Sequence, residues 1–239
     1  MTDNQFGHHI SQQFNAELEG LRHRVLAMGG LVEQQIAAAV KALVDGDSEL
    51  ATSVIEADHR VNAFEVSIDE QCTQVLALRQ PTASDLRLIV AVIKTITDLE
   101  RIGDQAEKVA RMALKLISLE RPSNEYIEIQ HLGEHVKQML SLVLDAFARM
   151  DAEAALEIVG KDKNIDHEYD GIMRQLVTFM MEDPRQIKRS LDIMWAIRAL
   201  ERIGDHSTNI CEYIIYLVKG KDVRHTTLEQ MKETALGKR

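Results

Sequence analysis

Aromatic side chains are scarce in this sequence of 239 residues: they make up 4%, against 45% for hydrophobic residues of all kinds. A core with so few rings must be built from aliphatic side chains, alanine and methionine, which suits helices better than β-sandwiches. Prolines number three, so long helices are allowed almost throughout the chain. The single tryptophan, Trp195, is expected in the core or at an interface. These shortages predict an all-α protein.

Cysteine, basic charge and long apolar runs are also lacking. The two cysteines, Cys72 and Cys211, lie far apart, which favours a reducing compartment over a disulfide framework. A net charge of -10 disfavours nucleic acid as a partner, because nucleic-acid-binding domains are typically basic. No apolar run approaches the roughly 18 residues that a membrane span needs, and the first residues lack a secretory signal pattern. We therefore expect a soluble, cytoplasmic protein.

The most informative feature that is present is an internal repeat. The pentapeptide Glu-Arg-Ile-Gly-Asp occurs at 100–104 and again at 201–205. Upstream, three positions match in order: Asp58, Val61 and Asn62 against Asp162, Ile165 and Asp166. Self-similarity of this kind indicates one structural unit used twice. We predict a first unit at 1–121 and a second at 122–239, the latter ending in a basic, loosely ordered tail.

Each unit contains the signals for three helices. Asp45-Gly46-Asp47 breaks the chain in the first unit, Asp151 can cap a helix in the second, and Arg121-Pro122-Ser123 separates the two units. The predicted helices are 9–45, 47–78, 83–118, 124–150, 152–181 and 185–219. Because short connections make neighbouring helices antiparallel, we predict two tandem three-helix bundles, related by a pseudo-two-fold axis or by a translation.

Paired acids interrupt the apolar face of the third helix in each unit. Glu100 and Asp104 are four residues apart, so they lie side by side on the helix, and Glu201 and Asp205 repeat the pair. Two carboxylates this close repel each other unless an arginine, a shared proton or a metal ion neutralises them. Magnesium, manganese and iron ions bind carboxylate oxygens readily.

Glycines and further oxygens accompany both acid pairs. Gly103 and Gly204 precede each Asp, although a glycine inside a helix costs about 1 kcal/mol relative to alanine. That cost is tolerable where another helix or an ion must approach closely. The second helix of each unit offers more oxygens, and the predicted metal ligands are Glu100, Asp104, Glu201, Asp205, Asp58, Asn62, Asp162 and Asp166. The main alternative is a buried ion pair with an arginine from a neighbouring helix.

Taken together, these motifs resemble the PhoU family of phosphate-transport accessory proteins. The resemblance rests on the doubled Glu-Arg-Ile-Gly-Asp, the upstream Asp-x-x-[Val/Ile]-[Asn/Asp] and the segment Leu86–Asp104, and it covers about residues 8–220. It implies six helices in two bundles, a cytoplasmic homodimer, and metal binding by the acidic motifs, with iron, manganese, magnesium or zinc as the ion. Asn62 and Asn209 are neutral and Asp98 corresponds to Ala199, so sites that include these positions are expected to be weaker.

The resemblance also implies a function. It is that of a negative regulator of phosphate uptake and of the phosphate-starvation response. Such a regulator acts as an adaptor between the ATPase of the phosphate ABC transporter and a sensor histidine kinase, and it meets the membrane only through these partners.

Motifs of enzymes are missing, so we expect no catalytic activity. The sequence has no phosphate-binding Gly-x-x-x-x-Gly-Lys-[Ser/Thr] and no Gly-x-Ser-x-Gly. Two alternatives to the regulator stay open. One is a ferritin-like di-metal enzyme, since Glu56-x-x-His59 and Glu128-x-x-His131 have the required spacing, although neither recurs in the other unit. The other is a structural scaffold in which the acids only pair with arginines.

Overall fold

The computed structural model describes residues 3–117 and 126–237, and within these ranges it contains helices and no strand. The first repeat consists of α1 (Asp3–Asp45), α2 (Ser48–Arg79) and α3 (Ala83–Ile117). The second consists of α4 (Ile127–Arg149), α5 (Ala152–Glu182) and α6 (Ile187–Lys219), with a 3₁₀ turn at Pro184–Gln186 before α6. A short seventh helix, α7 (Leu228–Ala235), follows. The prediction of an all-α fold with two three-helix repeats is confirmed.

Capping residues set three of the helix ends that the sequence predicted, which are the starts of α2 and α5 and the end of α6. The Asp47 carboxylate accepts a hydrogen bond from the Leu50 amide at the start of α2, and Asp151 accepts from the Glu153 and Ala154 amides at the start of α5. Gly220 ends α6 with a left-handed backbone, at φ 72°, which a glycine adopts without strain. The predicted start of α1 was wrong, because this helix already begins at Asp3.

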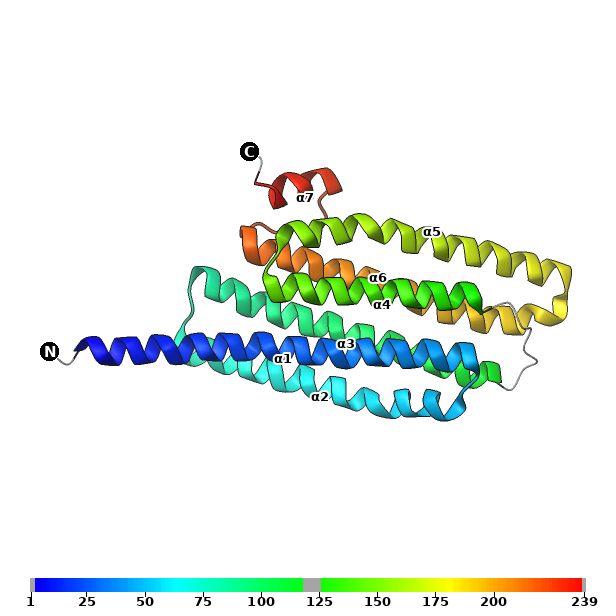
Figure 1. The fold of residues 1–239 in the computed structure, drawn as a ribbon, viewed down its shortest axis with the longest axis horizontal. Coiled ribbons are helices and arrows are strands. Elements are labelled where there is room, and N and C mark those ends of the chain that lie inside the picture. The colour runs from blue at the N-terminus through cyan, green and yellow to red at the C-terminus, as the bar shows by residue number, and fades with distance from the viewer. Residues whose placement is uncertain (1–2, 118–125, 238–239) are drawn as a thin grey trace.

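The two repeats are related by a pseudo-two-fold axis. Helices α1 and α4 run in opposite directions, and so do α3 and α6 (Figure 1), which a translation would not produce. The repeats meet through α3 against α6 and α1 against α4, which leaves α2 and α5 on opposite outer sides of the molecule. Each acidic motif therefore lies on a central helix, with the outer helix of its own repeat packed against it.

Close contacts between α1 and α4 show the same symmetry. A Cβ atom added to Gly29 would lie 2.4 Å from Leu144 Cδ2, and one added to Gly133 would lie 2.6 Å from both Cγ atoms of Val40. A branched side chain of each helix thus fills the space that a missing side chain leaves on the other. These glycines let the two helices approach more closely than any larger residue would allow.

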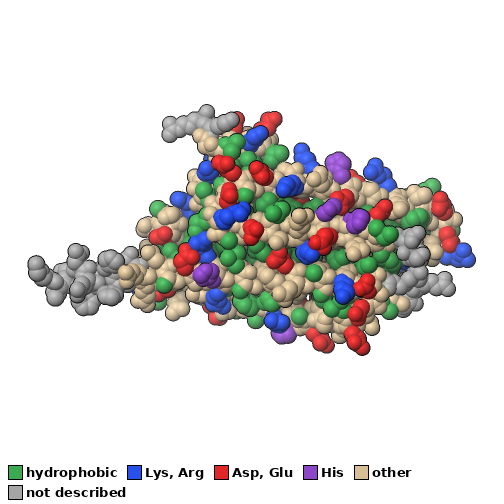
Figure 2. Space-filling view, in the orientation of Figure 1, with side chains coloured by type: hydrophobic (Ala, Val, Ile, Leu, Met, Phe, Trp, Pro, Cys, Tyr) green, Lys and Arg blue, Asp and Glu red, His purple; other side chains and the backbone are tan. Residues whose placement is uncertain are grey.

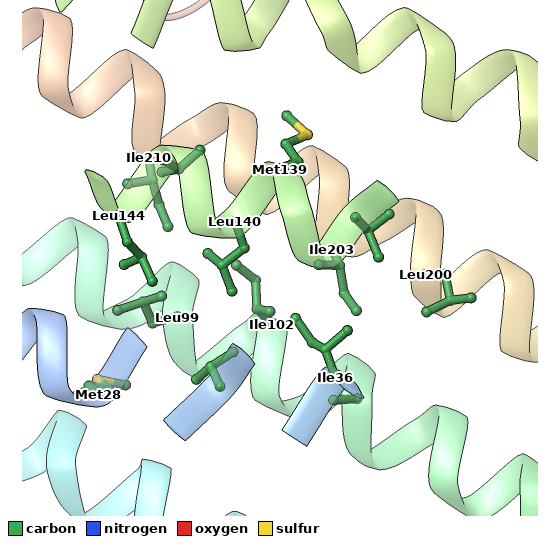
Figure 3. Packing of buried hydrophobic residues seen from close by; sticks show 14 of the residues in the cluster. Met28, Ile36, Leu99, Ile102, Met139, Leu140, Leu144, Leu200, Ile203 and Ile210 are labelled. Atoms are coloured by element: carbon green, nitrogen blue, oxygen red, sulfur yellow. The ribbon is translucent and has the colours of Figure 1, made fainter. Parts of the chain in front are cut away.

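One hydrophobic core runs through both repeats. Figure 3 shows Met28 and Ile36 of α1, Leu99 and Ile102 of α3, Leu140 of α4 and Ile203 of α6 converging between the helices. Ile102 and Ile203 are the isoleucines of the two Glu-Arg-Ile-Gly-Asp motifs, and both are fully buried. The repeats therefore stabilise each other, since neither could bury this surface alone. The predicted boundary between residues 121 and 122 lies outside the described residues and stays a prediction.

Two expectations about the second repeat were wrong. The tail is not loosely ordered over its described part, because α7 begins with a capping box between Thr227 and Gln230 and buries Met231 and Ala235. Trp195 is not in the core, because its side chain is 67% exposed near the start of α6. Its expected place at an interface stays a prediction.

The surface is mixed in charge. On the face shown in Figure 2, acidic and basic side chains are interspersed and neither sign forms a broad area. In the described part of the chain, no helix combines the length and the apolar composition that crossing a membrane would require.

A half-buried carboxyl near the end of α6 makes stability depend on pH. Burial and the nearby Asp222 raise the pKa of Glu212 from 4.5 to about 7, with Asp98 adding to the rise and Arg224 opposing it. Folding therefore favours protonated Glu212, and this contribution is complete below pH 4.5 and is lost as the pH rises through about 7. We therefore expect the free energy of unfolding of Glu212→Gln, relative to that of the unchanged protein, to be higher at pH 8 than at pH 5 by on the order of 1 kcal/mol. The effect is smaller than the full pKa shift implies because solvent screens a half-buried charge.

Urea unfolding followed by circular dichroism at pH 5 and pH 8 measures this gain. Glu229→Gln in α7 is the control, because Glu229 is exposed and its replacement should change stability equally at both pH values. An equal effect of Glu212→Gln at both pH values would contradict the prediction.

Candidate functional site

The first acid cluster lies between α2 and α3. We define it as Asp58 and Glu65 of α2 with Glu100, Asp104 and Glu107 of α3. Burial raises the pKa of Asp58, and so do the nearby charges of Glu107 and Asp104. Burial likewise raises the pKa of Glu100, followed by the charges of Asp104, Glu65 and Asp58. Because each carboxylate raises the pKa of another, the five groups share one electrostatic environment.

Gly103 makes this cluster possible and leaves polar atoms without partners beside it. A Cβ atom at Gly103 would lie 3.2 Å from Gln35 Oε1 and 3.5 Å from Asp58 Oδ1. Asp58 is 8% exposed and Gln35 of α1 is 6% exposed. Asn62 donates to Asp58 Oδ2 over 3.1 Å, whereas Asp58 Oδ1 and both polar atoms of the Gln35 amide lack a hydrogen bond of normal geometry. Buried oxygens without partners carry a desolvation penalty that a bound cation would remove.

The second acid cluster lies in the equivalent place between α5 and α6. We define it as Asp162 and Asp166 of α5 with Glu201 and Asp205 of α6. Burial, Asp166 and Asp205 raise the pKa of Asp162 to about 6. Gly204 again permits the close approach, since a Cβ atom there would lie 3.1 Å from Asp162 Oδ1. The repeat of the sequence is thus a repeat of the site.

An arginine enters the second cluster. Arg198 Nη1 donates to Glu201 Oε1 over 2.7 Å, and the guanidinium lies 5.7 Å from the centre of the Tyr169 ring. Burial still raises the pKa of Glu201, with Asp205 adding to the rise and Arg198 opposing it. The arginine comes from the same helix and is half exposed, so this pair differs from the predicted alternative, a buried ion pair with an arginine from a neighbouring helix.

The structure brings seven of the eight sequence-predicted residues into these two clusters and places the eighth, Asn62, in a hydrogen bond with Asp58, so the acidic rows of neighbouring helices do face one another. Their role as metal ligands stays a prediction. Sequence reasoning omitted Glu65, Gln35 and Arg198 from the site. Glu65 carries a usable signal, because it follows Asn62 by three residues and so lies on the same face of α2. Gln35 carries none, since a glutamine on an apolar helix face has many explanations.

The donor chemistry of both clusters fits a hard cation. Carboxylate oxygens are ligands that magnesium, manganese and iron ions accept, and one oxygen in each cluster, Asp58 Oδ1 and Glu201 Oε2, is buried without a partner. As the side chains lie, no three His, Cys, Asp or Glu residues of the described ranges converge closely enough to hold an ion. Holding one would therefore require side-chain rotations, for which the glutamates have the rotatable bonds.

Histidines contribute to neither cluster. His59 bonds the Glu56 carbonyl of its own helix, and His131 lines an open groove between α4 and α5 with Glu128. Neither Glu-x-x-His pair thus supports a ferritin-like centre. His206 is buried at the contact of α3 with α6, where its Nδ1 lies 2.7 Å from Asp98 Oδ1, so it has a structural role.

Comparison with known families decides the relationship of this chain. The PhoU domain matches twice, at residues 25–113 and at 129–214, which is once in each repeat. The chain belongs to the PhoU family. One Glu-Arg-Ile-Gly-Asp motif lies inside each matched segment, so both acid clusters lie within the part of the chain that matches the PhoU domain.

Named PhoU proteins are similar over nearly their whole length. A phosphate-specific transport system accessory protein PhoU homolog of Pseudomonas aeruginosa is 57% identical over 226 residues, which are 95% of this chain and 93% of that protein. The phosphate-specific transport system accessory protein PhoU of Escherichia coli is 51% identical over 230 residues, 96% of this chain and 95% of that protein.

Solved PhoU structures have the same fold. The crystal structure of PhoU from Pseudomonas aeruginosa has a TM-score of 0.84 at 55% identity and covers 87% of this chain and 100% of that one. The crystal structure of a second relative, the phosphate transport system regulatory protein PhoU from Streptococcus pneumoniae, has a TM-score of 0.81 at 32% identity. It covers 88% of this chain and 99% of that one.

Proposed function

We propose that this protein is a regulatory accessory protein of a phosphate-specific transport system. In this role it is a negative regulator of phosphate uptake and of the phosphate-starvation response. The observation that carries the proposal is the near full-length similarity, at 57% identity, to a phosphate-specific transport system accessory protein PhoU homolog. The two acid clusters on equivalent central helices support it, because partly buried acids that repel one another in both repeats are unfavourable for folding and so call for another explanation.

The proposal includes partners. The protein acts as a homodimeric adaptor in the cytoplasm and contacts the ATPase of the phosphate ABC transporter and a sensor histidine kinase. It meets the membrane only through them. A pull-down of each purified partner with the tagged chain tests these contacts directly.

The proposal also gives the clusters a chemical role. Asp58, Glu100 and Asp104 would hold a metal ion in the first repeat. In the second repeat the equivalent residues would do so: Asp162, Glu201 and Asp205. When bound, an ion such as iron, manganese, magnesium or zinc supplies positive charge that offsets the repulsion among the carboxylates. The residues in turn tie α2 to α3 and α5 to α6.

Removing one acid from each cluster tests the metal role and the regulatory role together. We expect Asp104→Ala with Asp205→Ala to lower metal affinity by at least about tenfold, since even groups behind the ligands typically matter by 10–100-fold. In phosphate-rich medium, a strain lacking the gene should overproduce alkaline phosphatase. The unchanged gene should suppress this, and the double variant should not.

Two surface acids provide the matched control. Asp145→Ala with Glu229→Ala removes the same charge from exposed positions outside both clusters, and this variant should keep both metal and repression. Normal alkaline phosphatase levels in the deletion strain would contradict the regulatory role.

The Arg198–Glu201 ion pair favours a second candidate, the structural scaffold. On that reading, protein purified without chelator would carry no stoichiometric metal. The double variant would then change neither metal content nor signalling.

A further inference from the structure

The two acid clusters differ at the positions that surround their shared motif. The pseudo-two-fold axis pairs Gly29 with Gly133, Asp58 with Asp162 and Glu100 with Glu201. The same register gives the remaining pairs, first repeat against second: Gln35 and Met139, Asn62 and Asp166, Glu65 and Tyr169, Thr97 and Arg198, Glu107 and Thr208. The first cluster therefore has acids, Glu65 and Glu107, where the second has a phenol and a hydroxyl. At Asn62 it has an amide where the second has the acid Asp166, which alone would weaken the first cluster. The largest difference in charge is the neutral Thr97 against the guanidinium of Arg198.

The first cluster is left open to a cation. Among the described residues, Arg101 is the basic side chain whose charge lowers the pKa of Glu100, and it is exposed on the next face of α3. Its counterpart Arg202 is exposed in the same way, so this pair makes no difference between the repeats. Glu107 is bound by Arg111, which is 54% exposed and reaches it from the outer surface.

Two buried groups also point to a ligand in the first cluster. Neither polar atom of the Gln35 amide has a hydrogen bond of normal geometry, and Asp58 Oδ1 has none either, although the Gln35 amide is near enough to lower the pKa of the Asp58 carboxyl. Both oxygens lie against Gly103, which directly precedes Asp104. In the second repeat the position of Gln35 is held by Met139, whose thioether sulfur is a poor ligand for hard cations.

In the second cluster one oxygen of the motif's glutamate is already paired with an arginine, whereas its other oxygen, Oε2, is buried without a partner. Arg198 donates to Glu201 Oε1 over 2.7 Å, and the Glu201 side chain is 11% exposed while that of Arg198 is 49% exposed. A guanidinium keeps its proton at all accessible pH values, so its charge cannot be switched off. The Tyr169 ring beneath it adds a cation–π contact that helps to hold it in place.

We propose that the two clusters take up divalent cations in a fixed order, the first cluster before the second, because Arg198 competes with the cation for Glu201. This rests on the proposed metal-binding function of the clusters and adds an inequality between them. A cation entering the second cluster must displace Arg198 from Glu201 or do without that ligand. A cation entering the first meets an unoccupied Glu100 and two unsatisfied buried oxygens. The second cluster is then the one that responds to changes in cation concentration.

Titration of the full-length, chelator-treated protein with Mn²⁺ tests the order. Electron paramagnetic resonance counts free Mn²⁺ and thus resolves classes of sites. We expect two classes whose dissociation constants differ by about tenfold or more, a factor equivalent to about 1.4 kcal/mol. Asp104→Asn should remove the tighter class and Asp205→Asn the weaker one. The opposite assignment, or two equal classes, would overturn the proposal.

Exchanging the residues that differ gives a sharper test. Arg198→Thr, which installs the residue of the first cluster, should tighten the weaker class by about tenfold and leave the tighter class unchanged. The reciprocal Thr97→Arg should weaken only the tighter class. Circular dichroism and thermal unfolding confirm that each variant folds, as expected for Arg198, which is half exposed.

The outcomes separate this proposal from the one on which it rests. Absence of Mn²⁺ binding to the unchanged, folded protein would remove the metal-binding function itself and this proposal with it. Binding at both clusters with no effect of Arg198→Thr would overturn the fixed order alone and leave the metal-binding function standing.

Discussion

Replacing Gly29 and Gly133 together with alanine is expected to destabilise the protein by up to about 4 kcal/mol. Overpacking a dense contact typically costs about 1–3 kcal/mol per site, and the better helix propensity of alanine offsets up to about 1 kcal/mol of this at each site. Each new methyl would meet a side chain of the facing helix well inside van der Waals contact, at 2.4 Å from Leu144 and 2.6 Å from Val40. The expected loss is read from urea unfolding followed by circular dichroism.

The two sites should contribute unequally. Val40 is branched at Cβ and has one strongly preferred rotamer in a helix, so it cannot move aside. The Leu144 methyls are at the end of a longer side chain and can rotate away from Gly29. Gly133→Ala should therefore account for most of the loss, and Val40→Ala in the same chain should relieve part of it.

The chain supplies its own control for this prediction. Gly30 is next to Gly29 in α1, and Gly160 lies in α5, yet a Cβ atom at either meets nothing within 4 Å. Alanine at these positions should stabilise the protein by up to about 1 kcal/mol each through helix propensity alone. A stabilising effect at all four glycines would show that α1 and α4 do not pack as closely as described.

Ile203→Ala is expected to cost about 2–5 kcal/mol, since removing a fully buried branched side chain leaves a cavity that the surrounding helices fill only in part. Ile203 is fully buried between the repeats, where Figure 3 shows it among residues of three other helices. Ile102→Ala, the same change in the other motif, should cost a similar amount. Both losses are measured by the same unfolding experiment.

The neighbouring arginine gives the matched control. Arg202 belongs to the same pentapeptide but is exposed, so Arg202→Ala should change stability by no more than about 0.5 kcal/mol. Equal losses for Arg202→Ala and Ile203→Ala would show that the motif does not divide into a buried and a solvent-facing side. That division explains how one pentapeptide supports both the core and the acid cluster.

Most of the fold could be predicted from the sequence because its signals are local. Asp47, Asp151 and Gly220 mark helix ends by their own backbone and side-chain chemistry, and the structure uses all three. Helix α7 escaped prediction because the segment after Gly220 is polar and basic. Its one local signal is the Thr227-x-x-Gln230 capping box, and the burial of Met231 depends on contacts with distant helices.

The sequence predicted most acids of the clusters but not the residues that other helices or rotamers bring to them. Spacing along one helix placed Glu100 beside Asp104, and the repeat placed Asp58 in the same unit, because both are periodic features of the sequence. The entry of Gln35 depends on how α1 packs against α3, which no spacing records. The hydrogen bond from Arg198 depends on a rotamer choice, since arginines along α6 could equally point into solvent.

The exposed position of Trp195 decides which spectroscopic signal suits which question. An indole that water already reaches at 67% of its surface will change its fluorescence little when the helices melt, so emission underestimates unfolding and helical ellipticity should be followed instead. The same indole sits near the start of α6, far along the chain from the loop before α7. A shift of its emission to shorter wavelength on mixing with another protein would therefore report coverage of that end of the second repeat, without any added label.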